Sequence, residues 1–399
     1  MAQSLTSPTV TEKFENNLLT ISLGGRIDSS NSESVEQKIN EMEKAHPGAE
    51  IQLDLEELEY ISSAGLRVIL RLRKSHPELK LVNVSAEVYD ILEMTGFSEM
   101  MPCEKAYRRL SVEGCEVIGQ GSNGKVYRID RDTIIKVYLN PDSLPDIHRE
   151  RELARKAFIL GIPTAIPYDV VKVGEGYGSV FELLNATSFT KLIQQDPASI
   201  DHVIDMYVDL LKKIHATELK PGDMPDMKQV ALGWADFLKD YLPEEVWQKI
   251  HDLVAAVPEN HHMMHGDYHT KNVMLQNGEV LLIDMDTLCM GDPIFEFASI
   301  YNAYQGFVEL NHEHSKEFLG LDYDTCCYLW NQTVRRYFEG ALEEEIQAIK
   351  EKSTLMGQIR LMRRSIRRMA GTPEGQAQIE CSKNHILELA PKIDSLLLK

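Results

Sequence analysis

Hydrophobic and polar positions follow two different periods in the first hundred residues of the chain. Three short apolar runs with interleaved polar positions predict strands, at Leu18–Leu23, Ile51–Leu55 and Leu79–Val84. The segments between and after them repeat apolar residues every three or four positions and predict helices, at Asn31–Lys44, Ser63–Lys74 and Val88–Met94. Alternation of this kind indicates a sheet covered by helices.

The periodicity changes after a short joining segment near residues 105–112, and a β-rich block begins near Glu113. Helical spacing then dominates almost to the C-terminus, interrupted by one strand-like hairpin, Val273–Leu275 and Val280–Asp284. We therefore expect an α/β domain at residues 1–108 and an α+β domain at residues 109–399. The second domain should consist of a β-rich lobe at about 109–185 and a helical lobe at about 186–399.

Composition and charge narrow the range of partners. The 399 residues include 62 Asp and Glu against 42 Lys and Arg, a formal net charge of −20. A field of that sign repels phosphate backbones and anionic lipids, so neither nucleic acid nor a membrane is an expected partner. No apolar run approaches the ~20 residues of a membrane-spanning helix, and the first residues show no signal-peptide pattern. We expect a cytoplasmic protein with reduced thiols, because the six cysteines form no CxxC pair.

A glycine-rich segment, GQGSNG, joins two apolar runs of the β-rich block. Its residues Gly119, Gly121, Ser122 and Gly124 would let backbone N–H groups approach phosphate oxygens with little steric hindrance. Taken alone, a glycine-rich hairpin turn is the commoner explanation of such a segment. A dinucleotide-binding fingerprint does not fit, because a strand and not a helix follows.

Lys136 lies in the apolar run TIIKVY, 15 residues after Gly121. A lysine on the strand that follows the glycine-rich hairpin can reach nucleotide phosphates, although many strand lysines face solvent. The acidic helix IHRERELARKAF offers Glu150 or Glu152 as the ion-pair partner of this lysine. Glu150 is preferred because three apolar residues share its helix face, whereas Glu152 has Lys156 four residues further on.

The most specific motif is HGDYHTKN, residues 265–272. Asp267 and Asn272 have the spacing of a phosphotransfer catalytic loop, in which the aspartate deprotonates a hydroxyl and the asparagine ligates Mg²⁺. Asp284, at the end of the apolar run in LLIDMD, would supply the carboxylate that bridges Mg²⁺ to nucleotide phosphates. Asp286 either assists it or faces solvent.

Histidines near this motif allow a rival interpretation. His261, His262, His265 and His269 lie close enough in sequence to suggest a transition-metal site, but their spacing matches no common zinc pattern. The order of the glycine-rich segment, the lysine, the acidic helix, the catalytic loop and the metal-binding aspartate instead indicates a kinase-like active site.

The stretch HGDYHTKNVML…LLIDMDTLCMGDPIFEFAS resembles the aminoglycoside phosphotransferase and choline kinase-like family in its HGDxxxxN, IDxD and GDPxxD elements. The resemblance implies a bilobal protein-kinase-like fold and a phosphotransferase that uses ATP or GTP with Mg²⁺. By position, Asp267 corresponds to the catalytic base, and Asn272 and Asp284 correspond to the Mg²⁺ ligands. Glu296 departs from the family's usual aspartate, and the longer acid should still support the catalytic loop.

The resemblance also implies a nucleotide site at the junction of the two lobes, with the adenine near residues 181–184. The expected nucleotide-binding residues are Gly119, Gly121, Ser122, Gly124, Lys136, Glu150, Glu182, Leu184 and His269.

The phosphoryl acceptor is expected to be a small molecule with a hydroxyl group. Asp292 of the GDP motif comes only eight positions after Asp284, which leaves little room for a peptide-docking segment. Acids such as Asp236, Asp240 and Glu339 could face an amine on the acceptor, but they fit a solvated surface equally well.

The first hundred residues resemble a STAS domain, the fold of anti-sigma factor antagonists, through ISSAGLRVIL after an LDL strand and through MTGF. By position, the resemblance places a phosphorylatable serine at Ser63, with Ser62 in place of the family's aspartate. Either serine could instead be a helix N-cap. The STAS domain is expected to regulate or sense. The alternative function is a signalling switch, in which the kinase-like domain phosphorylates Ser63 or a partner protein.

Overall fold

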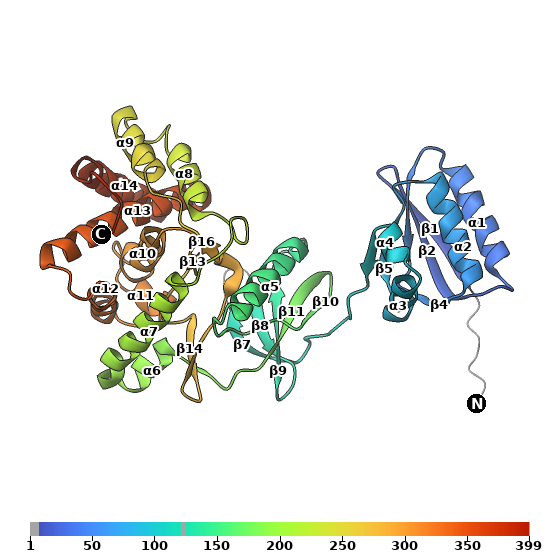
Figure 1. Cartoon of the computed structure of the whole chain (residues 1–399), viewed down its shortest axis with the longest axis horizontal. Coiled ribbons are helices and arrows are strands. Elements are labelled where there is room, and N and C mark those ends of the chain that lie inside the picture. Colours follow the sequence, from blue (N-terminus) through green and yellow to red (C-terminus); the bar gives the residue numbers. More distant parts are fainter. Residues whose placement is uncertain (1–7, 121–123, 399) are drawn as a thin grey trace. The chain divides into compact units, whose positions relative to one another are not determined.

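The chain forms two compact units, Met1–Ser111 and Val112–Lys399, in the computed structural model drawn in Figure 1. The structure describes residues 8–120 and 124–398. Among these residues, no helix combines the length and the apolar character needed to cross a membrane. Each unit has its own hydrophobic core, so each is described by itself.

The first unit is a six-stranded sheet with helices packed on it. Strands run in the order β1-β2-β3-β5-β6, with β4 also paired to β2, and all pairs are parallel except the β1–β2 hairpin. The strands are β1 (Thr9–Glu15), β2 (Leu18–Ile27), β3 (Glu50–Asp54), β4 (Leu58–Ile61), β5 (Lys80–Val84) and β6 (Cys103–Lys105). The helices are α1 (Ser32–Ala45), α2 (Ser63–Ser75), α3 (Ala86–Met94) and α4 (Phe97–Met100).

The α/β class expected for the first unit is confirmed, and the period-2 pattern of β2 explains why. Leu19, Ile21 and Leu23 are buried and alternate with less buried residues. The sequence analysis missed β1, β4 and β6. β1 is almost entirely exposed at a sheet edge, and β4 and β6 are only four and three residues long, so none of them carries a clear apolar alternation.

The second unit begins with a five-stranded antiparallel sheet in the order β10-β11-β9-β8-β7. Helix α5 packs beside this sheet and places Leu153, Ala154 and Ala157 in the buried core (Figure 1). The elements are β7 (Glu116–Gln120), β8 (Gly124–Arg128), β9 (Thr133–Tyr138), α5 (Leu144–Ile159), β10 (Asp169–Val173) and β11 (Gly176–Glu182).

The rest of the second unit is mainly helical, as expected. Its helices are α6 (Phe189–Gln195), α7 (Ile200–His215), α8 (Met227–Phe237), α9 (Glu244–Ala255), α10 (Pro293–Tyr301), α11 (His314–Phe318), α12 (Tyr323–Tyr337), α13 (Glu343–Met369) and α14 (Pro373–Leu389). Short helical turns lie at Pro197–Ser199, Met285–Thr287, Asn302–Gly306 and Ala390–Lys392. Its strands are β12 (Thr187–Ser188), β13 (Met263–Met264), β14 (Val273–Gln276), β15 (Glu279–Leu282) and β16 (Cys289–Met290).

The expected hairpin is present, but its second strand is shorter than predicted. β14 and β15 pair around Asn277 and Gly278, which both have positive φ angles. β15 ends at Leu282, so Asp284 lies beyond the strand and adopts a left-handed backbone with φ of 63°. Asp tolerates this conformation better than most residues, because its short polar side chain can bond locally.

Buried tyrosines attach the segment between β13 and β14 to helix α7. The hydroxyl of Tyr207 donates to the carbonyl oxygen of Tyr268 at 2.9 Å, and the hydroxyl of Tyr268 donates to the carbonyl oxygen of Tyr207 at 2.7 Å. The hydroxyl of Tyr304 accepts a hydrogen bond from the backbone N–H of Thr270 at 3.1 Å. Because all three rings are fully buried, these bonds hold the HGDYHTKN segment in one position.

Candidate active site

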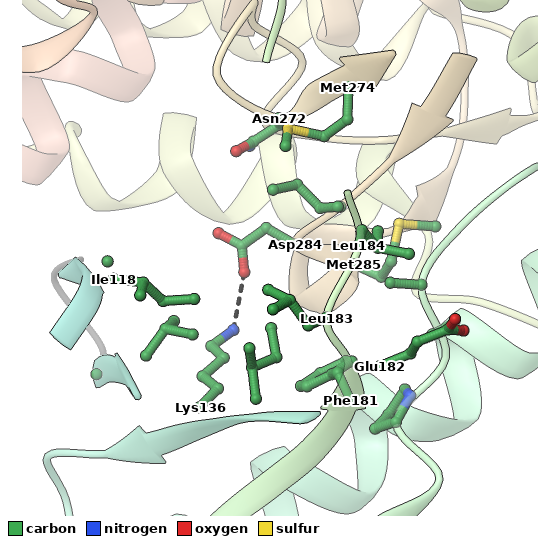
Figure 2. A pocket seen from close by; sticks show the side chains of 18 of the residues that line it. Ile118, Lys136, Phe181, Glu182, Leu183, Leu184, Asn272, Met274, Asp284 and Met285 are labelled. Atoms are coloured by element: carbon green, nitrogen blue, oxygen red, sulfur yellow. Dashed lines mark hydrogen bonds and ion pairs between the residues drawn. The ribbon is translucent and has the colours of Figure 1, made fainter. Parts of the chain in front are cut away.

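A cavity of about 400 Å³ lies between the five-stranded sheet and the β14–β15 hairpin (Figure 2). Apolar side chains, including Val126 and Met274, form much of its wall. The predicted nucleotide-binding residues that line it are Gly119, Gly124, Lys136, Glu150, Glu182 and Leu184, and the predicted metal ligands Asn272 and Asp284 line it as well. An apolar cavity with a few convergent polar groups has the character of a ligand site.

Lys136 is the polar centre of this cavity. Its Nζ atom lies 3.0 and 3.2 Å from the two carboxylate oxygens of Glu150 and 2.8 Å from Oδ1 of Asp284 (Figure 2). Burial alone would lower the pKa of Lys136, but the negative charges of Asp284 and Glu150 outweigh it and raise that pKa. The amine is therefore protonated at neutral pH.

The choice between two glutamates is decided by the helix face. Glu150 is buried on α5 and pairs with Lys136, and it also accepts a hydrogen bond of 2.7 Å from the hydroxyl of Tyr138. Glu152 is exposed and lies 3.4 Å from Lys156, one helical turn further on. Tyr138, two residues after Lys136 on β9, was not identified from the sequence as part of this cluster.

The glycine-rich segment is described at its two ends. Gly119 on β7 and Gly124 on β8 line the cavity, whereas Gly121 and Ser122 lie outside the described residues. A Cβ atom on Gly124 would collide with the carbonyl oxygen of Val137 on the neighbouring strand, so close strand packing alone requires glycine there.

The catalytic-loop motif is held by a buried carboxylate. Both oxygens of Glu296 lie at the backbone N–H groups of His265 and Gly266, with N–O distances of 2.5 to 3.2 Å. Gly266 has φ of +81°, and a Cβ atom there would lie 2.5 Å from the carbonyl oxygen of Thr287, so this position requires glycine. The longer acid at 296 thus supports the loop.

Asp267 and Asn272 face each other across this loop. The Nδ2 atom of Asn272 donates to the carbonyl oxygen of Asp267 at 3.0 Å. Burial alone would raise the pKa of the Asp267 carboxyl group, but the neighbouring His269, with smaller effects of Arg360 and His265, lowers it to about 2. Asp267 is therefore a carboxylate at neutral pH and can accept a proton.

His269 lies beside the predicted base and does not line the cavity, unlike the other described nucleotide-site candidates. Its Nε2 atom is 3.6 Å from Oδ2 of Asp267, and its ring packs edge-on against Phe318. The histidines of this region do not gather as metal ligands. Within residues 8–120 and 124–398, the group of side chains with that geometry is Glu309, Cys381 and His385 on other elements.

Asn272 and Asp284 offer the ligand atoms that Mg²⁺ prefers, an amide oxygen and carboxylate oxygens. Both side chains point toward the cavity in Figure 2, and Asp284 contacts the Lys136 amine. Burial and the charge of Asp284 raise the pKa of the nearby Asp286 to about 7. The residues present fit a magnesium ion that is bound together with nucleotide phosphates.

A second cavity, of about 210 Å³, adjoins the catalytic loop on the side of α8 and α13. Its wall includes Gly266, Asp286, Arg149, Arg360 and Trp234. Arg360 also donates from Nη1 to the carbonyl oxygen of Gly266 at 3.1 Å. The sequence analysis did not identify this arginine, although its helix carries paired arginines in LMRRSIRRM.

In the first unit, the two candidate serines differ in their surroundings. The hydroxyl of Ser62 caps helix α2 by accepting from the backbone N–H of Gly65 at 3.5 Å. Ser63 is the first residue of α2, and its side chain is exposed. The capping role considered for either serine thus belongs to Ser62.

Two family models match this chain. That of the phosphotransferase enzyme family matches residues 114–325, and that of the STAS domain matches residues 9–110. The first match covers more than half of the chain. The chain therefore belongs to the phosphotransferase enzyme family, and it carries a STAS domain before the phosphotransferase region.

Individual relatives resemble each unit separately. The protein named "Putative anti-sigma factor antagonist BtrV" of Bordetella bronchiseptica is 36% identical over 90 residues, which is 21% of this chain and 76% of that protein. A thermostable mutant of aminoglycoside phosphotransferase APH(4)-Ia in ternary complex with ADP and hygromycin B is 12% identical, with a TM-score of 0.50, and the match covers 77% of this chain and 98% of that chain. APH(4)-Ia itself matches with 12% identity, a TM-score of 0.50 and coverage of 69% and 93%. These structures show the shared kinase-like fold.

Replacing Glu296 by glutamine should destabilise the second unit, because an amide N–H₂ group would then face backbone N–H groups that now have a carboxylate acceptor. The cost expected for a buried donor left unsatisfied is about 1–3 kcal/mol in the free energy of unfolding. Urea denaturation measures it, with Glu317→Gln on the exposed surface as the control. Equal stability of the two variants would show that the Glu296 carboxylate does not hold the loop.

Proposed function

We propose that the protein is an ATP- or GTP-dependent, Mg²⁺-dependent phosphotransferase that acts on the hydroxyl group of a small molecule, with the STAS domain as a regulatory or sensing module. The observation that carries this proposal is the convergence of Lys136, Glu150, Asn272 and Asp284 on one cavity, with the backbone of Asp267 hydrogen-bonded to Asn272. We assign the STAS domain to residues 1–108 and the kinase domain to 109–399, with its lobes divided near residue 185.

The nucleotide would bind in the 400 Å³ cavity. Apolar residues of the connecting segment, among them Phe181 and Leu184, suit an adenine or guanine ring. Lys136 would hold the phosphates while Glu150 keeps its amine in place. Asn272 and Asp284 would hold Mg²⁺, which neutralises phosphate charge as transfer proceeds. APH(4)-Ia was crystallised with ADP, which supports nucleotide use by this fold.

Asp267 would act on the acceptor. Its carboxylate would accept the hydroxyl proton as the acceptor oxygen bonds to the γ-phosphorus and the bond from that phosphorus to the β–γ bridging oxygen breaks, releasing ADP or GDP. Because its pKa is about 2, the carboxylate is ionised throughout the neutral range. A backbone fixed by Glu296 and by the buried tyrosines positions it without further rearrangement.

The short connection from Asp284 to Asp292 supports a small acceptor over a peptide. A helical turn, Met285–Thr287, and the two-residue strand β16 occupy this connection. The acids considered as amine ligands do not favour a cationic acceptor, because Asp236, Asp240 and Glu339 are exposed and line neither cavity.

Replacing Asp267 by asparagine should reduce phosphoryl transfer by about 10²–10⁴-fold, the usual contribution of a positioned general base. The measurement is ADP formation from MgATP, first with water and then with a panel of hydroxylated acceptors. Affinity for MgATP should stay within about twofold, because Asp267 does not line the nucleotide cavity. Asp240→Asn is the matched control on the exposed surface. Unchanged turnover in Asp267→Asn would exclude this residue as the base.

The exposed hydroxyl of Ser63 supports a second candidate, a signalling switch. Ser62 already caps α2, so phosphorylation of Ser63 would leave the cap intact and place negative charge at a helix N-terminus, where the helix dipole stabilises it. The similarity of this unit to BtrV supports a docking role for the STAS domain. In this candidate, the kinase domain phosphorylates Ser63 of its own or another copy, or a partner protein.

Incubation with MgATP should then add one phosphoryl group, detected by intact-mass spectrometry. Ser63→Ala and Asp267→Asn should each abolish the adduct, whereas Ser75→Ala, an exposed serine at the other end of α2, should retain it. An unmodified wild-type protein, or an adduct that persists in Ser63→Ala, would contradict self-phosphorylation at this serine.

A further inference from the structure

Five arginines lie along one side of helix α13. Counted from the first, they occupy positions i, i+3, i+4, i+7 and i+8, which share a helix face. We call this group the arginine stripe: Arg360, Arg363, Arg364, Arg367 and Arg368. At a rise of 1.5 Å per residue, the stripe extends over about 12 Å of the helix.

The positive charge of the stripe is not neutralised within the second unit. Among the described residues, no carboxylate forms an ion pair with any of the five, although the chain has a net charge of −20. By contrast, Arg335 and Arg336 on α12 are paired with Glu343 and Asp205. Like charges one turn apart destabilise a helix, so the stripe is unfavourable unless something else offsets it.

Aromatic rings hold three of these guanidinium groups without neutralising them. The guanidinium carbon of Arg360 lies 5.6 Å from the ring centre of Trp234, that of Arg363 lies 5.6 Å from Phe237, and that of Arg364 lies 5.1 Å from Phe307. Trp234 and Phe237 belong to α8, which packs against α13 (Figure 1). The side chains are therefore positioned in advance, with their charges available to a ligand.

The Nε atom of Arg363 adds an independent observation. It is buried and has no hydrogen-bond partner. Burial and the charge of Arg367 lower the pKa of Arg363, and burial with the charges of Arg368 and Arg360 lowers that of Arg364. Unpartnered, mutually repelling guanidinium groups are what an anionic ligand would stabilise.

The stripe begins at the reacting groups. Arg360 lines the second cavity and donates to the carbonyl oxygen of Gly266, the residue before the proposed base. The carboxylate of Asp267 interacts electrostatically with both Arg360 and Arg364. Arg149 on α5 contributes a further positive charge to the same cavity wall. The second cavity therefore places two arginines beside Gly266, the residue that precedes Asp267.

At this cavity the acidic and basic side chains are equal in number, so the excess positive charge of this region comes from the rest of the arginine stripe. Glu296 is fully buried and its oxygens accept the two backbone N–H groups, so it is not available to a cationic ligand. Asp286 lines this second cavity, whereas Asp284 lines the 400 Å³ cavity. The remaining charged groups of the wall are Arg149 and Arg360.

We propose that the phosphoryl acceptor is a small anion, a hydroxylated compound that already carries a phosphate or carboxylate group, and that Arg360 and Arg364 bind this group while Asp267 takes the hydroxyl proton. This inference rests on the proposed function and specifies its substrate class. Guanidinium groups pair with planar or tetrahedral oxyanions through two parallel hydrogen bonds, which fixes the orientation of the acceptor. Arg367 and Arg368 extend the site to acceptors with a second anionic group.

The test is equilibrium binding to the full chain with its nucleotide site saturated by MgADP. Two series of probes each compare an anionic, a neutral and a cationic hydroxylated compound: glucose 6-phosphate, glucose and glucosamine, and glycerol 3-phosphate, glycerol and ethanolamine. We expect the phosphorylated member of at least one series to bind tenfold or more tightly than its neutral and cationic counterparts. The double variant Arg364→Gln/Arg368→Gln should lose that preference, and Arg335→Gln, which removes an arginine paired with Glu343, should keep it.

Any other outcome contradicts the proposal of an anionic acceptor. Equal binding within a series, stronger binding of the amines, no binding of either phosphorylated probe, or a preference that persists in the double variant would exclude an anionic acceptor at the stripe. Tighter binding of polyglutamate than of every small probe would assign the stripe to an acidic protein instead. MgADP binding and the Asp267-dependent turnover of MgATP test the proposed phosphotransferase function separately. A failure of that function can therefore be distinguished from a failure of the anionic-acceptor proposal.

Discussion

The buried ammonium group of Lys136 is the interaction on which the second unit depends. It joins strand β9 to the next element, helix α5, through Glu150, and to the segment after β15, 148 residues further along the chain, through Asp284. A lysine with only 16% of its side chain exposed is costly unless it is paired. Two carboxylates satisfy it, and the same three charges surround the cavity in which we place the nucleotide. Lys136, Glu150 and Asp284 thus stabilise the fold and also line the proposed nucleotide site.

The HGDYHTKN loop is held in place in a different way, by hydrogen bonds to its backbone. Glu296 receives the N–H groups of His265 and Gly266, and buried tyrosines hold Tyr268 and Thr270. The loop therefore keeps Asp267 and Asn272 in register without depending on solvent-exposed contacts. Asn272 of this loop lines the 400 Å³ cavity, and Gly266 lines the second cavity together with Arg360 of the arginine stripe.

The fold class and most residues of the candidate site could be predicted from local sequence motifs. The features that could not be predicted depend on contacts between residues that are distant in sequence. The alternation in β2 and the spacing from Asp267 to Asn272 are encoded in consecutive residues, so the fold class and the loop could be inferred directly. Strand β1 was missed because an exposed edge strand has no apolar face. The position of His269 beside Asp267, and not in the cavity, depends on Phe318 from another element. The arginine spacing on α13 is visible in the sequence, but its proximity to Asp267 arises only when α13 packs beside the loop.

We propose that Lys136, Asn272 and Asp284 form a magnesium–nucleotide site. Calorimetric titration of AMP-PNP with and without Mg²⁺ tests this proposal most directly. We predict one binding site per chain, with an affinity that requires Mg²⁺ and falls at least tenfold in Asp284→Ala. Absence of binding, or binding that is equally tight without Mg²⁺ and in Asp284→Ala, would contradict it.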